Sequence, residues 1–103
     1  MTWDEIKQAV GDGRDELGIC ALASAKTGLA IKIVDCEVWR LGYIGTYDAK
    51  NERAIIYFKM LSYEVSIAHG VDALEQTPDQ FRDYVVDMLV EAADHVKDKE
   101  ARP

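Results

Sequence analysis

The side chains in this sequence best suited to bind a metal or act as nucleophiles are two cysteines and two histidines: Cys20, Cys36, His69 and His95. No two of them lie at the short spacing typical of zinc ligand pairs. The chain also lacks the Gly-rich phosphate loop, the H-E-x-x-H zinc motif and the G-x-S-x-G nucleophile motif. Cys36 with a histidine could form a thiol nucleophile, but the neighbouring Asp35 and Glu37 would raise the thiol pKa and oppose reactivity. We therefore expect no catalytic residue, no metal site and no cofactor.

The cysteines and the N-terminus also bear on the compartment. Each cysteine is isolated within apolar sequence, which favours buried thiols in a reducing environment; a Cys20–Cys36 disulfide is the alternative. The N-terminal residues, Met-Thr-Trp-Asp-Glu, are too acidic and polar for a secretory signal. No stretch approaches the roughly 18 to 20 apolar residues that span a bilayer. We expect a cytoplasmic protein that does not bind membranes.

An acidic stripe is the strongest chemical pattern in the chain. If the C-terminal segment is a helix, five of its carboxylates fall within an arc of roughly 80°. These residues are Asp83, Asp87, Glu91, Asp94 and Asp98. Like charges four residues apart cost a helix roughly 0.2 to 0.5 kcal/mol per pair. The functional interpretation is a docking surface for a basic protein, such as a nucleic-acid-binding protein whose groove receives phosphates. The alternative is a solvated helix face.

A wide apolar arc on the same segment is a second candidate surface. Val86, Val90 and Ala93 lie outside the stripe of residues that one sheet would bury. This surplus favours packing against a second copy of the chain, which would make a homodimer, or against another partner. The alternative is that the N-terminal helix or residues 63–74 cover these valines.

The overall charge restricts the class of partner. Nineteen acidic residues against twelve basic ones give a formal net charge of -7. Phosphate backbones and anionic membranes repel such a surface, which argues against direct nucleic-acid binding. Basic residues are expected together with one tyrosine on the outer sheet face, at Lys32, Arg40, Arg53, Tyr57 and Lys59. One aromatic side chain makes a poor stacking platform for bases, so a basic protein is the favoured partner.

Helix signals stand at both ends of the chain. The capping-box pattern Thr-Trp-Asp-Glu at residues 2–5 predicts a short first helix that Gly11 ends. Thr-Pro-Asp-Gln at residues 77–80 combines an N-cap, a first-turn proline and a capping partner. Core-facing apolar spacing then predicts a long helix over residues 78–97. The charged tail, residues 99–103, is expected to fray.

The middle of the chain shows the apolar–polar alternation of an antiparallel sheet. Strands are predicted at residues 29–33, 39–47, 53–61 and 63–67, with a polar hairpin loop at residues 48–52. Residues 19–24 are ambiguous, because their alanines suit a helix while a hairpin through the next four residues would suit a strand. We favour the strand.

These elements predict one α+β domain over residues 1–103. It comprises a short N-terminal helix, an antiparallel β-meander of three to five strands, and a long C-terminal amphipathic helix packed on the sheet. The residues expected to share the core are Ile31, Trp39, Ile56, Phe58, Phe81, Val85, Met88 and Leu89.

No motif assigns the chain to a family. Its layout and low isoelectric point are similar to those of small secretion chaperones, and equally to those of small acidic inhibitors encoded by phages and bacteria. No residue role carries over from either group. We expect a non-catalytic acidic protein-binding module, such as an inhibitor, immunity-type or accessory protein, that engages a basic partner surface. One alternative is a homodimeric chaperone-like or scaffold protein that binds through apolar helix and sheet surfaces. The other is a small enzyme without a recognisable motif.

Overall fold

The computed structural model describes residues 1–39, 42–43, 46–47 and 52–101. In chain order the described elements are α1 (Trp3–Val10), the 3-10 helix η1 (Gly11–Gly13), α2 (Ile19–Thr27), β1 (Ile31–Trp39), β2 (Gly42–Tyr43), β3 (Thr46–Tyr47), β4 (Arg53–Met60), β5 (Tyr63–His69), the 3-10 helix η3 (Val71–Glu75) and α3 (Pro78–Ala101). The arrangement is α+β, with a short N-terminal helix and a long C-terminal helix packed on an antiparallel sheet, as the sequence predicts.

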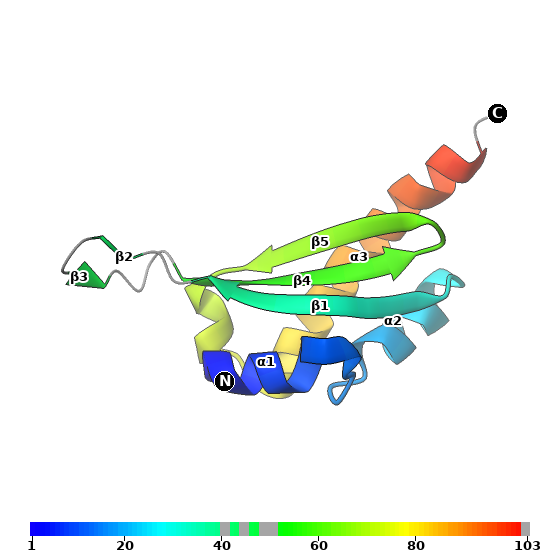
Figure 1. Ribbon diagram of the computed structural model, residues 1–103. Helices are drawn as coiled ribbons and strands as arrows, with labels where there is room; N and C mark the ends of the chain where they lie inside the picture. The colour runs from blue at the N-terminus through cyan, green and yellow to red at the C-terminus, as the bar shows by residue number, and fades with distance from the viewer. Residues whose placement is uncertain (40–41, 44–45, 48–51, 102–103) are drawn as a thin grey trace.

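The sheet has two unequal faces. Its strands run antiparallel in the order β1-β4-β5, and β2 and β3 pair separately as a two-stranded sheet. One face is buried under the helices α1, α2 and α3 (Figure 1). The buried strand residues on that face are Ile31, Ile33, Cys36, Ala54, Ile56, Phe58, Met60 and Ile67. The hydrophobic core therefore lies between one sheet face and one layer of helices.

The predicted helix caps are present. The Oγ1 atom of Thr2 accepts a hydrogen bond from the Glu5 amide at 3.2 Å, and Gly11 ends α1. At α3, Thr77 Oγ1 accepts from the Gln80 amide at 3.2 Å, and Gln80 Oε1 accepts from the Thr77 amide at 3.0 Å. This reciprocal capping box is confirmed, and α3 continues to Ala101, beyond its expected end.

The strand favoured for residues 19–24 is wrong, because these residues belong to helix α2. The carboxylate of Asp15 accepts hydrogen bonds from the Cys20 amide at 3.1 Å and the Ala21 amide at 3.3 Å. This side chain satisfies amides that the first turn of a helix leaves unpaired. Gly28, in the left-handed conformation with φ 75°, ends the helix. The carboxylate cap and the alanines outweigh the hairpin interpretation.

Trp39 was expected in the core but its side chain is 47% exposed. The register between β1 and β4 shifts between Ile33 and Asp35. An extra residue in one strand moves all later side chains to the opposite face. Beyond the shift Cys36 is buried, and Trp39 therefore points out.

Met88 is the second residue misplaced by the sequence analysis, since it is 37% exposed. α3 packs against α2 as well as β5. Because α2 covers this side of α3, the buried face of the helix includes Val86, which is fully buried. Met88 lies about 160° from Val86 around the helix at about 100° per residue, so it is left at the edge of the core.

The predicted polar loop at 48–52 lies outside the described residues except for Glu52. Glu52 precedes β4 and is only 4% exposed, which the polar surroundings in the sequence did not indicate. The indole Nε1–H of Trp3 donates a hydrogen bond to Glu52 Oε2. The contact ties α1 to the start of β4.

Candidate binding surfaces

Both thiols are held in their protonated form. Cys36 is buried and Cys20 is half-buried, and both are free rather than disulfide-bonded. Burial and the charge of Asp35 raise the Cys36 pKa to about 11, against the opposing effect of Lys7. Burial and the charge of Asp15 raise the Cys20 pKa to about 12. The direction predicted for Cys36 is confirmed, and it opposes a role as a nucleophile.

The two histidines occupy different environments. His69 ends β5 and is buried, with its ring stacked on Tyr84 at 4.2 Å and on Phe81 at 5.5 Å between centroids. Its Nε2 atom lies 2.9 Å from Gln76 Oε1. His95 is exposed on α3. Within the described part of the chain, no three His, Cys, Asp or Glu side chains are grouped so that they could hold a metal ion.

The acidic stripe lies on the exposed side of α3. All five of its residues, Asp83, Asp87, Glu91, Asp94 and Asp98, are exposed. At about 100° per residue they centre roughly opposite the buried face of the helix. The last turns of α3 project past the end of the sheet in Figure 1, and Lys99 in these turns lies over the Tyr63 ring of β5, with its Nζ atom 5.6 Å from the ring centroid.

Ion pairing leaves the middle of the stripe unneutralised. At its start Arg82 contacts Asp83 at 3.1 Å and also Asp79 at 3.3 Å. Among the described residues, no ion pair joins Asp87, Glu91 or Asp94 to a cationic side chain. These three carboxylates therefore contribute a local negative field at the surface of α3, which salt screens.

The apolar arc of α3 is largely covered within the chain. Val86 is fully buried and Val90 is half-buried. The covering element is α2, which packs on this side of α3. The sequence suggested the N-terminal helix or residues 63–74 as the cover for these valines. It did not suggest α2, because a strand was predicted for residues 19–24. Val86 is consequently part of the core rather than of the surface.

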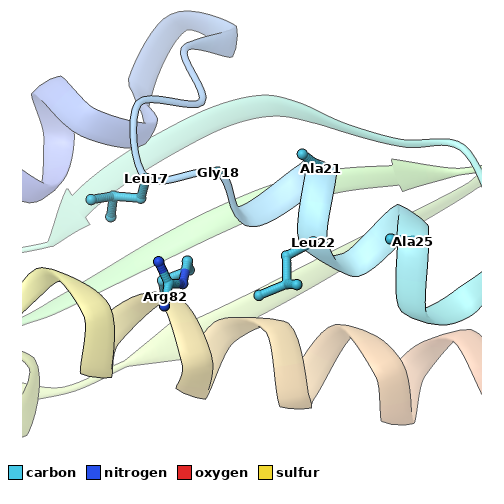
Figure 2. Close-up of a pocket in the computed structure, with 6 residues that line it drawn as sticks. All are labelled: Leu17, Gly18, Ala21, Leu22, Ala25 and Arg82. Carbon is cyan, nitrogen blue, oxygen red and sulfur yellow. The ribbon is translucent and has the colours of Figure 1, made fainter.

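A shallow groove of about 510 Å³ opens between α2 and the start of α3. Its lining residues are Leu17, Gly18, Ala21, Leu22, Ala25 and Arg82. Figure 2 shows Leu22 extending from α2 toward α3, with Arg82 rising from α3 beside it. The Arg82 guanidinium is already engaged by two carboxylates, so the groove does not offer an unpaired cation to a ligand.

A second groove, of about 190 Å³, runs between strand β5 and the flank of α3. Its lining residues are Val65, Ser66, Ile67, Met88, Glu91, Ala92 and His95. One stripe residue, Glu91, therefore also borders an apolar groove beside an edge strand. Sequence reasoning missed this surface, because the packing of the α3 flank beside β5 is a tertiary property.

The outer sheet face mixes both signs of charge. Lys32 and Lys59 face each other across β1 and β4, as expected for this face. Tyr57 donates a hydrogen bond from its hydroxyl to Glu37 Oε2 at 3.0 Å, and this bond raises the Tyr57 pKa. Arg40, the other basic residue expected here beside Arg53, lies outside the described residues. The carboxylates among these cations weaken any attraction for phosphates.

Neither the helices nor the comparisons with known proteins add a further candidate site. Although α3 has 24 residues, none of the described helices combines the length and apolar character needed to cross a membrane. Comparison of the chain with protein-family models, curated proteins and solved structures finds no match.

Proposed function

We propose that this protein is a non-catalytic acidic binding module that engages a basic surface of a protein partner through the α3 stripe. An inhibitor, immunity-type or accessory protein would act in this way. The observation that carries the proposal is the exposure of Asp87, Glu91 and Asp94 on one face of α3, where none of them forms an ion pair with a cationic side chain of the described residues. The opposite face of the helix is anchored in the core, so the carboxylates are held on a rigid support.

The geometry of the stripe favours a particular kind of basic surface. From Asp83 to Asp98 the helix rises about 22 Å, with about one carboxylate every 5 to 6 Å. A DNA strand carries about one charge per 3.4 Å of axis. The stripe is thus a linear array of negative charge at somewhat lower density, which suits a groove that receives a single phosphate strand. We propose a nucleic-acid-binding protein as the partner class.

Charge reversal tests this function. Asp87→Lys with Glu91→Lys changes the net charge from -7 to -3, because each substitution adds two units. Long-range attraction acts mainly on association, so the partner captured by the wild-type chain should bind this variant at least about tenfold more slowly. The association rate of the wild-type protein should also fall as salt rises. Biolayer interferometry across a salt series measures both effects.

A matched control separates the stripe from net charge alone. Glu16→Lys with Asp72→Lys makes the same charge change at exposed positions outside α3. We expect this control to associate within about threefold of the wild-type rate, since local charge dominates steering at short range. Wild-type association that is independent of salt, together with unchanged binding by the α3 variant, would show that the stripe is only a solvated face.

A further inference from the structure

The two edges of the three-stranded sheet are treated differently by the fold. Along β1, the Ile31 amide donates to Ser24 Oγ at 3.2 Å, and η1 packs beside the strand, where the Gly13 backbone approaches the Ile33 carbonyl. The register shift after Ile33 further distorts this edge. Bulges and covering loops are the devices that prevent an edge strand from pairing with another chain.

Within the described part of the chain, strand β5 has none of these protections. It pairs with β4 in an unshifted register from Tyr63 to His69, and no other described strand adjoins it. Its sequence contains neither proline nor lysine, which commonly guard open edges. β5 is therefore a regular edge strand, and no other strand of the described residues pairs with its outer side.

The turn before β5 fixes which backbone groups face outward. Leu61 and Ser62 form a two-residue turn, and Met60 and Tyr63 flank it as partners. Such a flanking pair is hydrogen-bonded, and bonded pairs then alternate along the strand. The N–H and C=O groups of Glu64, Ser66 and Ala68 therefore point away from β4, toward the open side.

The side of α3 next to β5 provides an apolar surface beside this edge. Tyr84 and Met88 are each 37% exposed although they lie beside the buried face of α3. Met88 and Ala92 line the groove against β5. A strand added about 4.8 Å beyond β5 would place every second side chain over this flank, and it would cover the exposed apolar surface.

We propose that β5 accepts an extended segment of the protein partner as an additional strand, and that this segment alternates apolar with basic residues. Backbone pairing supplies affinity in this mode of recognition, and the alternate side chains supply specificity. The apolar side chains would lie on Met88 and Ala92. The basic side chains would then lie on the outer side of β5, near Glu64. The inference rests on the proposed function, because the stripe supplies the charge that selects a basic segment.

Charge decides between a basic partner and a second copy of this chain. Pairing two β5 edges would bring together two molecules that each carry a net charge of -7. It would also bring the two Glu91 side chains toward the same shared interface. A basic segment instead carries charge opposite to that of this chain, so electrostatic complementarity selects it.

Backbone amide exchange followed by NMR tests the proposal directly. The probe is a nine-residue capped peptide of alternating valine and lysine, added to the full chain at low salt. In the free protein, we expect the outward amides of Glu64, Ser66 and Ala68 to exchange faster than those of Val65 and Ile67. With the peptide at ten times its dissociation constant, the outward amides should exchange about tenfold more slowly.

Two further peptides and one variant serve as controls. A peptide with glutamate in place of lysine should not slow exchange of the outward β5 amides. Neither should a peptide that is N-methylated at the residues whose N–H groups would point toward β5. Ser66→Pro removes one outward N–H and leaves the pairing with β4 intact, so it should abolish protection. Circular dichroism establishes that this variant is folded, and the N-methylated peptide keeps the test decisive if it is not.

The outcomes separate this inference from the proposed function. One outcome would overturn the inference: the N-methylated peptide binds as tightly as the parent peptide, and the variant Asp87→Lys with Glu91→Lys binds neither peptide. The stripe would then bind basic ligands without the β5 edge. Absence of protection by the parent peptide at millimolar concentration also overturns the inference. If the outward amides exchange slowly in the free protein and sedimentation shows a dimer, the β5 edge pairs with a second copy of this chain instead.

Discussion

At the scale of single residues, Glu52 is the most unusual side chain. It is a carboxylate at 4% exposure whose Oε2 atom accepts the Trp3 indole hydrogen bond, while its Oε1 atom has no hydrogen-bond partner among the described residues. Burying a charge with unfilled hydrogen-bonding capacity is costly. The contact nevertheless joins α1 to β4 across 49 positions of sequence, so it couples the N-terminus to the central strand.

Substitutions at this contact should have unequal effects. Trp3→Phe removes the indole donor and leaves both buried oxygens of Glu52 unpaired, so it should destabilise the fold by about 1 to 3 kcal/mol. Glu52→Gln keeps an acceptor for Trp3 and removes the buried charge, so it should cost less than about 1 kcal/mol. Urea unfolding followed by far-ultraviolet circular dichroism measures both. A larger loss for Glu52→Gln would show that the charge itself stabilises the fold.

At the scale of elements, helix α2 determines how the rest of the chain packs. It covers the Val86 side of α3, contacts β1, and forms one wall of the groove in Figure 2. Its own N-terminus depends on the carboxylate of Asp15, which lies five residues before Cys20 and hydrogen-bonds to its amide. Much of the helix layer is therefore positioned by one side-chain cap.

Removing this cap should weaken the whole domain. Asp15→Ala leaves the amides of Cys20 and Ala21 without their acceptor, and loss of an N-terminal cap typically costs about 0.5 to 2 kcal/mol. Asp15→Asn retains an acceptor oxygen and should recover most of that stability. The midpoints of urea unfolding curves compare the three proteins. Equal midpoints for Asp15→Ala and the wild-type protein would mean that solvent replaces the cap at no cost.

The elements also show how far local sequence determines structure. Both terminal helices were predicted because their caps are formed by residues within three positions of one another, as with Thr77 and Gln80. α2 was missed because its cap comes from a more distant residue within an irregular segment. Trp39 was misplaced because a single register shift, with no glycine or proline to mark it, reverses the faces of β1.

The candidate site was predicted only in part, for the same reason. The five acidic positions follow from helical spacing, and their exposure is as expected. The groove depends on how α3 packs beside β5, and the exposure of Met88 depends on where α2 lies. Neither of these is a local property, so spacing and composition could not reveal the groove between β5 and α3.

At the scale of the whole molecule, the raised thiol pKa values link stability to alkaline pH. The pKa of Cys36 is about 11 and that of Cys20 about 12 in the folded state, against an ordinary value of 9.0. Below pH 9 both states keep these protons, and their contribution to stability is fully present. Above pH 9 the unfolded chain releases the protons first, so stability falls as pH rises toward the folded-state values.

A variant without thiols should therefore be less sensitive to alkaline pH. We expect the wild-type protein to lose more unfolding free energy between pH 8 and pH 10.5 than the double variant Cys20→Ser with Cys36→Ala. Urea unfolding at the two pH values measures the difference, and the variant controls for lysine and tyrosine titration. Equal losses in both proteins would indicate that the thiols titrate normally in the fold.

The register shift in β1 has an optical consequence. It places Trp39 in water while Trp3 stays in the core, with side-chain exposures of 47% and 6%. The two indoles of this chain therefore report on different events when it is excited in the near ultraviolet. Trp39 is already solvated before unfolding, so most of the red shift on denaturation should originate from Trp3. Fluorescence of the intact protein is then a local probe of the junction between α1 and β4.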